Sequence, residues 1–333
     1  MTPIHVGRQP LDDPHELELR PFEAGTDDYL ALARVRNETL RATTLPEDYR
    51  DMSAAEMQQY YYRADFDLSA NAWLMRHRGE PVAGAVVYPS VIFTDRPPGN
   101  FDMYVVPDYW RHGIGSRLLA HLEQAAMERG HRVLETTVAE EDEQSKGFLS
   151  RKGFAVVSHA LHLVRRGMDD LPEAQLASGY AIRSLAELRE PPELYMDTAN
   201  RLGAYDSNYT LVRAEELERT VAGEGWDPAG VLFLFDGRER IVGVIRASAS
   251  RVGPEASAAG RRGYLHEIRL EPSSRGQGLG TAMVAVALRY LREAGVTRVE
   301  LDTAGENTAA QGLAVRAGFE LARHWLHFLK RLV

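Results

Sequence analysis

The sequence predicts an α+β fold that occurs twice in tandem, each copy a mixed central sheet flanked by helices. Three observations support this: the order of the predicted elements, a glycine-rich loop that recurs, and the length of the chain. Helical and alternating segments follow one another without the regular strand–helix alternation of a parallel sheet, as is typical of α+β domains. A chain of 333 residues also suits two domains of about 150 residues each.

The glycine-rich loop at 272–281 has a counterpart 165 residues earlier, at 107–116. The same offset relates Gly153-Phe154 to Gly318-Phe319, and the histidines at 159 and 162 to those at 324 and 327. A repeat this long indicates a duplicated domain rather than a solenoid, whose units have about 20–50 residues. We therefore expect a loose tail at 1–14, domains at 15–166 and 180–333, and a linker at 167–179.

The elements of the first copy follow from alternation, helical periodicity and capping residues. Asp27 or Asp28 suits a helix N-cap, and Ser53 with Glu56 forms the capping box of a second helix. Gly130 ends the helix that follows the glycine loop. In order, we expect a strand at 17–20, helices over 30–40 and 53–62, strands at 72–76, 82–88 and 101–106, a helix at 113–129, a strand at 133–138, a helix at 143–152 and strands within 154–164.

The second copy repeats this order. We expect a strand at 180–184, helices at about 192–203 and 213–222, strands at 231–235, 240–250 and 264–270, a helix at 279–294, a strand at 298–303, a helix at 307–316 and closing strands within 319–332. The insert at 252–260 is rich in small residues, so a mobile loop is expected there.

The composition excludes several classes of partner and site. The net charge is −9, from 39 basic and 48 acidic residues, so neither nucleic acid nor an anionic membrane is an expected partner. There is no cysteine, which excludes disulfides, thiolate nucleophiles and an enzyme thioester. The N-terminus has no apolar signal region and no run approaches about 18 apolar residues, so a cytoplasmic location is expected by default.

The loop after the strand 264–270 predicts an anion site. Free N–H groups at a helix start, together with the positive end of the helix dipole, bind anions. The loop lacks the Gly-Lys-Ser/Thr ending of a P-loop that binds nucleoside triphosphates. It also fails as a G-x-G-x-x-G dinucleotide fingerprint, because Thr281 and Met283 stand where the third glycine belongs. The alternative is an ordinary glycine-rich turn, and the duplication argues against it.

What remains is an Arg-x-x-Gly-x-Gly pattern after a strand and a proline, from Arg275 to Gly280. This pattern resembles the acetyl-CoA-binding signature of the GNAT acetyltransferase superfamily, in which the loop wraps the pyrophosphate of the cofactor. The resemblance covers nearly the whole chain, twice, and the tandem layout is similar to that of the mycothiol synthase-like members. It implies the GNAT fold, acetyl-CoA as the cofactor, and direct acetyl transfer to an amine.

The resemblance also assigns cofactor-binding residues by position. In the second copy these are the backbone of Ile268 and Leu270 and the residues Arg275, Gly276, Gln277, Gly278, Gly280, Thr281 and Asn307. In the first copy they are Val105, Arg111, Gly113, Gly115 and Ser116. Trp110 stands there in place of the signature arginine, so weaker binding of acyl-CoA, or none, is expected in this copy. Asn307 is equally suited to cap the helix that follows it.

A carboxylate on the central strand is the expected general base, because members of the family often use one to take the proton from the acceptor amine. An amine of pKa near 10 is mostly protonated at pH 7 and cannot attack a thioester in that form. Glu267 is the first candidate, and Asp102 in the equivalent place is the weaker one. Regular alternation puts Glu267 and Arg269 on one face and His266, Ile268 and Leu270 on the other. The alternative for Glu267 is a solvated carboxylate paired with Arg269 or another cation.

The chain departs from the family pattern at one position in each copy. Ala314 and Leu149 stand where the family often has a tyrosine that protonates the departing thiolate. Tyr205, Tyr209 or a water are candidates for that role, and a thiol of pKa about 8.5 also leaves as a thiolate.

The recurring histidine pairs predict no metal site. Their members are three residues apart, which on a strand puts them on opposite faces. No His/Asp/Glu cluster has convincing ligand spacing. Structural or interdomain roles are therefore expected for the four histidines.

The expected function is direct transfer of an acetyl group from acetyl-CoA to a primary amine of a small molecule or peptide. The second domain is expected to be catalytic, because it alone keeps both the signature arginine and the longer acid. The first domain would then complete the structure and contribute a wall of the acceptor cleft. The alternative is a degenerate pair that binds acyl-CoA as a sensor or scaffold and transfers nothing.

Overall fold

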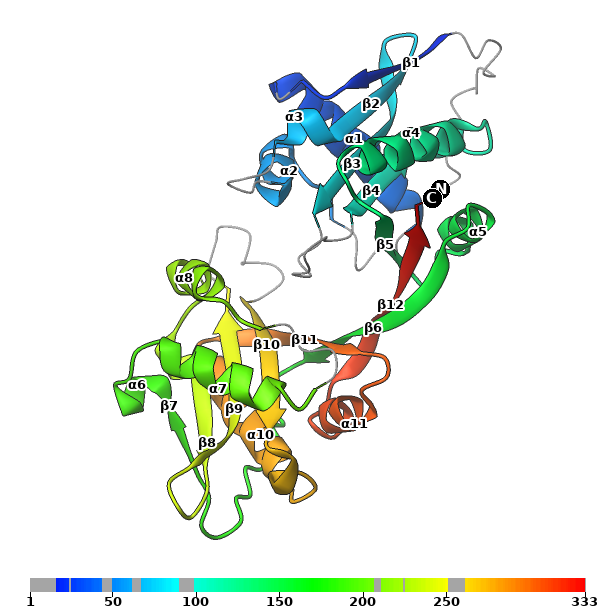
Figure 1. The fold of residues 1–333 in the computed structure, drawn as a ribbon. Helices are drawn as coiled ribbons and strands as arrows, with labels where there is room; N and C mark the ends of the chain where they lie inside the picture. The colour runs from blue at the N-terminus through cyan, green and yellow to red at the C-terminus, as the bar shows by residue number, and fades with distance from the viewer. Residues whose placement is uncertain are drawn as a thin grey trace. The chain divides into compact units, whose positions relative to one another are not determined.

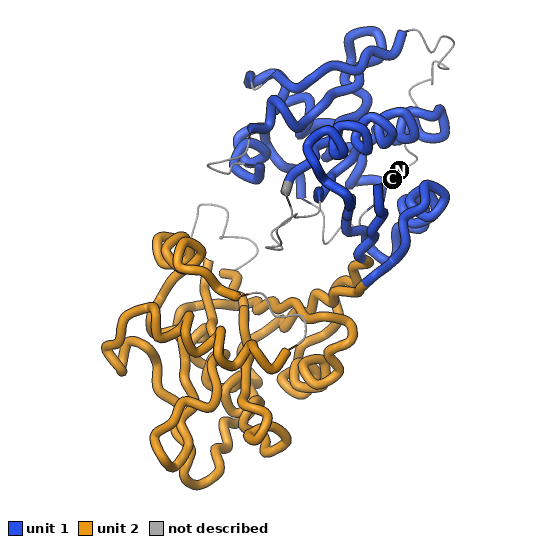
Figure 2. The backbone as a smooth tube through the Cα atoms, in the orientation of Figure 1, with its two compact units in different colours: residues 1–157, 327–333 blue, residues 158–326 orange. Residues whose placement is uncertain are grey.

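A computed structural model describes residues 16–23, 25–43, 50–61, 67–89, 99–206, 211–223, 225–250 and 261–332. The chain divides into two compact units (Figure 2). Unit 1 consists of residues 1–157 and 327–333, and unit 2 of residues 158–326. The predicted tail at 1–14 and the predicted mobile loop at 252–260 lie outside the described residues.

Unit 1 is a mixed sheet covered by helices (Figure 1). Its strands lie in the order β1-β2-β3-β4-β5, and the end of β12 follows β5. Strands β4 and β5 are parallel, and β1, β2, β3 and β4 are joined by antiparallel pairings. The elements are β1 (Leu17–Pro21), α1 (Thr26–Thr43), α2 (Ala54–Tyr61), α3 (Leu68–Asn71), β2 (Ala72–His77), β3 (Glu80–Pro89), β4 (Gly99–Val105), η3 (Pro107–Tyr109), α4 (Ile114–Glu128), β5 (Val133–Ala139) and α5 (Glu143–Arg151).

Unit 2 has the same layout, with strands in the order β6-β11-β10-β9-β8-β7. The β10–β11 pair is parallel, and the pairs β6–β11, β9–β10, β8–β9 and β7–β8 are antiparallel. Both units are therefore α+β with mixed sheets, as predicted. The elements are β6 (Ala155–Arg166), β7 (Ala181–Ser184), α6 (Leu185–Leu188), α7 (Glu193–Gly203), α8 (Ala214–Ala222), η4 (Pro228–Gly230), β8 (Val231–Phe235), β9 (Ile241–Ala249), β10 (Arg261–Leu270), η5 (Pro272–Ser274), α10 (Leu279–Glu293), β11 (Val296–Ala304), α11 (Thr308–Arg316) and β12 (Glu320–Arg331).

The two closing strands, β6 and β12, are each continuous where the sequence predicted several strands. They also end in the unit of the other repeat. Residues 160–166 of β6 pair with 298–304 of β11 in unit 2. At the end of β12, Lys330 Nζ donates to Glu123 Oε1 at 2.6 Å in unit 1. The predicted linker at 167–179 falls in unit 2, where Met168 is buried in the core.

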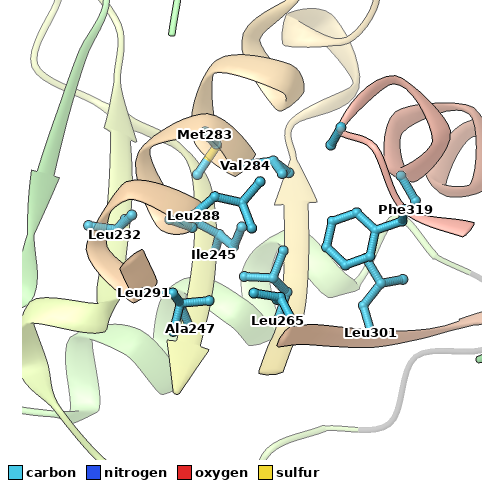
Figure 3. Close-up of a cluster of buried hydrophobic side chains, with 14 of the residues drawn as sticks. Leu232, Ile245, Ala247, Leu265, Met283, Val284, Leu288, Leu291, Leu301 and Phe319 are labelled. Atoms are coloured by element: carbon cyan, nitrogen blue, oxygen red, sulfur yellow. The ribbon is translucent and has the colours of Figure 1, made fainter. Parts of the chain in front are cut away.

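The core of unit 2 fixes which helix covers which face of the sheet. Leu232 and Leu234 of β8 share a buried cluster with α10, and Figure 3 shows Met283, Leu288 and Leu291 of that helix beside Ile245, Ala247 and Leu265. The intervening residues Val231, Phe233 and Phe235 pack with α7 and α8. Because side chains alternate along a strand, α10 lies on one face and α7 with α8 on the other. The loop from β10 into α10 therefore stands at the end of the sheet's middle strands.

Candidate functional site

The loop between β10 and α10 is built on glycines in the left-handed region. Gly276 has φ +76° and Gly278 has φ +77°, and Gly278 is the N-cap of α10. A side chain in this conformation costs about 1–2 kcal/mol, so glycine is favoured at both positions. The helical ladder begins with the bond from Ala282 N–H to Gly278 O, 3.1 Å. The N–H groups of 279–281, at the start of the helix, are left without helical partners.

The first turn of α10 differs from that of a capped helix. No side chain caps it, and its first turn carries no acidic residue. The start of α4 in unit 1 is the same in both respects. By contrast, α5 is capped by Asp142 and carries Glu143 in its first turn. An uncapped helix start without its own negative charge is a suitable place for a phosphate group.

Arg275, the signature arginine, is held by the chain itself. Its Nε donates to the carbonyl of Leu270 at 3.1 Å, and its Nη2 lies 3.5 Å from Asp206 Oδ1. In unit 1, Trp110 Nε1 donates to the carbonyl of Val105, the counterpart of Leu270, at 2.6 Å. Two unlike side chains thus brace the end of the same strand. Part of the role expected of Arg275 is therefore structural.

The two loops differ one residue further on. Arg111 occupies the place of Gly276 and has φ +66°, a conformation that L-residues other than glycine rarely adopt. Gly113, with φ +80°, is the N-cap of α4 as Gly278 is of α10. The first copy therefore keeps the geometry of the loop, with an added cation where the second copy has a glycine.

A cavity of about 420 Å³ opens at the loop of unit 1. All five residues predicted to bind the cofactor in this copy line it: Val105, Arg111, Gly113, Gly115 and Ser116. Phe148 supplies an apolar wall, and Arg151 and Lys152 add positive charge. A volume within the usual range of about 300–1,000 Å³ for small-molecule sites, with cations at one end, suits an anionic ligand with an apolar arm.

The strand β10 carries a bulge at the predicted base. Leu265 pairs with Ala247 and Ile268 with Ile245, so His266 and Glu267 together oppose Arg246. Such a bulge interrupts the ladder and re-aims a side chain. In unit 1 the pairing of β3 with β4 runs from 83↔105 to 89↔99 without a register shift. The two copies therefore differ in backbone geometry at the strand carboxylate.

The bulge corrects the alternation predicted from the sequence. Leu265, Ile268 and Leu270 all pack on the α10 side of the sheet. His266 instead stacks against Tyr264, with ring centroids 4.7 Å apart, and its Nε2 lies 2.7 Å from Ser248 Oγ. The prediction that His266 shares a face with Ile268 was wrong. One extra residue between paired positions shifts the alternation, so the side chains on either side of the bulge no longer follow the simple two-residue period.

Glu267 is held by a tyrosine that the sequence did not single out. Tyr195 Oη of α7 donates to Glu267 Oε2 at 2.5 Å, and Arg246 Nε donates to the same phenol oxygen at 3.2 Å. Burial, and then the negative charge of Glu267, raise the pKa of Tyr195 well above its ordinary value, so the phenol stays protonated. Arg269, expected as the alternative partner, donates to Asp206 at 2.9 Å. Glu267 is thus an oriented, half-buried carboxylate.

Asp102 in unit 1 is also bound by tyrosines. Tyr61 Oη of α2 donates to one carboxylate oxygen at 2.6 Å, and Tyr88 Oη of β3 to the other at 3.3 Å. Val86, fully buried, stands opposite Asp102 in the sheet. Neither Tyr61 nor Tyr88 is the repeat counterpart of Tyr195, since position 30 is Leu30. Each copy therefore fixes its carboxylate by a different set of contacts.

The remaining predicted residues fall into structural places. Asn307 caps α11, accepting from Ala310 N–H at 3.0 Å, as the capping alternative predicted. Ala314 and Leu149, at the positions of the family's tyrosine, are buried in the two cores. Tyr205 is 54% exposed, and Tyr209 lies outside the described residues.

The recurring histidines make polar contacts within the units. His159 Nδ1 lies 2.9 Å from His324 Nε2, and His162 Nδ1 lies 2.8 Å from Asp302 Oδ1. His327 Nε2 lies 3.2 Å from Glu135 Oε2. Within the described part of the chain, no three His, Cys, Asp or Glu side chains form a group that could hold a metal ion. The same part contains no helix long and apolar enough to cross a membrane.

The sequence did not predict two contacts at the strand carboxylate, that of Tyr195 with Glu267 and that of Arg246 with Tyr195. No motif marks either residue, and they lie 72 and 21 positions before Glu267. Only the packing of α7 on the sheet brings Tyr195 to the strand. The one available signal was the period of α7, in which Tyr195, Ala199 and Leu202 form a buried stripe.

Comparison with known proteins agrees with this geometry. The family model described as Acetyltransferase (GNAT) family matches residues 34–154 and 199–319. A mycothiol acetyltransferase of Pseudarthrobacter chlorophenolicus is 24% identical, over 95% of this chain and 93% of that protein. A mycothiol acetyltransferase of Geodermatophilus obscurus is 29% identical, over 66% of this chain and 69% of that protein.

Solved structures share the tandem fold. A GCN5-related N-acetyltransferase from Sphaerobacter thermophilus has a TM-score of 0.73 at 20% identity and covers 96% of both chains. A tandem GNAT protein from the clavulanic acid biosynthesis pathway has a TM-score of 0.66 at 20% identity, over 96% of this chain and 99% of that one. With both halves matched by the family model and the fold shared along the chain, this protein belongs to the acetyltransferase (GNAT) family, as a tandem N-acetyltransferase.

Proposed function

We propose that the protein transfers an acetyl group from acetyl-CoA to a primary amine of a small molecule or peptide, and that unit 2 performs the reaction. One observation carries the proposal: the oriented carboxylate of Glu267 lies on the strand that leads into the uncapped start of α10. From Glu267 to the end of β10 at Leu270 the strand rises about 10 Å. An extended cofactor with an anionic end and a reactive end fits along such a strand.

The residues of unit 2 suit acetyl-CoA by their chemistry. The N–H groups of 279–281 and the two left-handed glycines leave room and donors for a pyrophosphate. The bulge interrupts the ladder beside Ile268, so backbone groups there are available to an amide-containing arm. Acetyl-CoA would supply the activated acetyl group as a thioester.

Glu267 is the proposed general base. Its carboxylate takes a proton from the acceptor ammonium, directly or through a water, and so frees the nitrogen lone pair for attack. Tyr195 keeps one oxygen oriented, which leaves Glu267 Oε1 as the free proton acceptor. Ala314 cannot donate a proton in place of the family's tyrosine. A thiol of ordinary pKa about 8.5 leaves as a thiolate without a general acid.

Unit 1 is proposed as a second acyl-CoA site that does not turn over. Its cavity, its left-handed Gly113 and its added cation Arg111 favour binding. Its carboxylate is less suited to act as a base, because Tyr61 and Tyr88 occupy both oxygens of Asp102. We therefore propose that unit 1 binds acyl-CoA, where the sequence predicted weaker binding or none. Unit 2 remains the proposed catalytic unit.

A matched pair of substitutions tests the proposal. Glu267→Gln should lower turnover by at least about a hundredfold, the usual contribution of a general base, while acetyl-CoA binding by calorimetry is unchanged. Asp102→Asn removes the equivalent charge from unit 1 and should change turnover little. Turnover is followed as thiol release from acetyl-CoA with a panel of amines. If Asp102→Asn is the more damaging change, unit 1 is the catalytic unit.

The same assay separates the enzyme from a sensor. A protein that only binds acyl-CoA would show a calorimetric signal and no amine-dependent thiol release from either the wild type or the variants. The two relatives are mycothiol acetyltransferases, which indicates a small-molecule acceptor for those proteins. We extend only that class, a small amine, to this chain.

A further inference from the structure

Arg246 of β9 stands opposite the bulge and beside the proposed base. Its Nε donates to Tyr195 Oη at 3.2 Å, and its guanidinium lies over the ring of Tyr195, 5.8 Å from the centroid. The side chain is half-buried. Among the described residues, the hydrogen bond and the ring contact of its side chain are both with Tyr195, and neither Nη group has a carboxylate partner.

The two other arginines nearby share one carboxylate, and the nearby histidine is uncharged. Arg269 and Arg275 both contact Asp206, at 2.9 and 3.5 Å. His266 is uncharged, because burial and then the positive charge of Arg246 lower its pKa to about 3. Among these side chains, Arg246 is therefore the charged group on the proposed acceptor face with no carboxylate of the described residues beside its Nη groups.

In unit 1 the residue opposite the strand carboxylate is apolar. Asp102 is bound by two tyrosine hydroxyls, and the position of Arg246 is taken there by the buried Val86. Glu267 likewise has its own tyrosine, Tyr195. Holding the base therefore does not explain a half-buried guanidinium, which is costly to desolvate unless it finds a partner.

We propose that Arg246 binds a carboxylate of the acceptor, so that the acceptor is an amine with a carboxylate close to it. The inference rests on the proposed function. With Nε on Tyr195, the two Nη groups form the planar fork that binds a carboxylate by two parallel hydrogen bonds. Glu267 then lies on the amine side of the same ligand.

The spacing of the two charges sets how close the acceptor's groups are. Glu267 and Arg246 meet at one oxygen, Tyr195 Oη, at 2.5 and 3.2 Å. An ammonium at Glu267 and a carboxylate at Arg246 must therefore be near neighbours on the acceptor, as they are in an α- or β-amino acid. Glu267 first takes a proton from the ammonium of the acceptor and releases it to solvent. The neutral nitrogen then forms a bond to the acetyl carbon and gives its second proton to Glu267, while the C–S bond breaks and its electron pair leaves with the thiolate.

The test compares acids with their amides on the full-length protein. The acceptors are L-leucine, L-phenylalanine and β-alanine, the three corresponding amides, and two amines without a carboxylate, glucosamine and ethanolamine. The variants are Arg246→Gln and Arg246→Lys. Arg240→Gln is the matched control, because Arg240 lies in the same unit just before β9 and is ion-paired with Asp236. The readout is kcat and KM from thiol release, as the ratio of variant to wild type for each acceptor.

We expect the wild type to prefer the acids. Arg246→Gln should lower kcat/KM about ten- to a hundredfold for an acid, mainly through KM, and change it less than about threefold for the amide. Arg246→Lys should fall between, since it keeps the charge and loses the fork. Arg240→Gln should change neither, and acetyl-CoA affinity should be the same throughout.

Three results would overturn the inference. An equal loss for an acid and its amide would make Arg246 a positioning residue that acts through Tyr195. A wild type that prefers the amides, glucosamine or ethanolamine would show that no carboxylate is recognised, and the proposed function would stand. Absence of thiol release with every acceptor would refute the proposed function itself, and the inference with it.

Discussion

Replacing Gly278 by leucine should weaken acetyl-CoA binding in unit 2 at least about tenfold while leaving the fold intact. Gly278 has φ +77°, and a Cβ built there meets no atom within 4 Å, so the side chain would point into open space at the helix start. The direct cost to stability is the left-handed strain, about 1–2 kcal/mol. For a unit of this size that lowers the melting temperature by about 2–8 °C.

The effect on binding is larger, because the new side chain occupies the space in front of the N–H groups of 279–281. One lost charge-assisted hydrogen bond to phosphate is worth about 1.5–3 kcal/mol, and its loss weakens acetyl-CoA about ten- to a hundredfold. Gly295→Leu is the matched control. Gly295 has φ +76°, equally open surroundings and a place at the opposite end of α10.

Calorimetric titration with acetyl-CoA and thermal unfolding are measured on both variants. Similar losses of melting temperature are expected from the two substitutions, with weaker binding at one site only for Gly278→Leu. Gly113→Leu, at φ +80° in unit 1, should weaken the other site. Equal affinity in Gly278→Leu and Gly295→Leu would refute the assignment of the loop as the phosphate site.

Two further predictions concern stability. The carboxylate of Asp28 is buried, which alone raises its pKa, but hydrogen bonds from Arg20 and from Glu23 N–H outweigh this and lower it below 3.8. The folded pKa is thus below the unfolded one, so the stabilisation is present above about pH 3.8 and is lost as the pH falls through the folded value. The difference in unfolding free energy between wild type and Asp28→Asn, from urea titrations, should shrink between pH 7 and pH 3, and a constant difference would contradict it. Deleting 327–333 should speed amide hydrogen exchange in β5 of unit 1 before β8 of unit 2, because the end of β12 belongs to unit 1; the reverse order would favour contiguous domains at 15–166 and 180–333.

The sequence by itself determined the duplication, the order of the elements and the place of the two glycine loops that we propose as cofactor sites. These are local properties. Gly113 and Gly278 are required where the chain turns into a helix at positive φ, and a missing cap leaves N–H groups free whatever the rest of the chain does. The 165-residue offset then transfers each conclusion from one copy to the other.

Tertiary structure alone decided the geometry of the base and the ends of the repeats. The bulge at His266-Glu267 depends on how β10 pairs with β9, and the period of a strand does not encode an extra residue. Tyr195 and Arg246 reach Glu267 from a helix and a neighbouring strand. The sequence also did not predict that β6 and β12 each end in the unit of the other repeat. Both strands end in the same pattern, Arg165-Arg166 and Lys330-Arg331, and equivalent sequences suit either sheet. Pairing partners are chosen by long-range packing, and that choice is made only when the whole chain has folded.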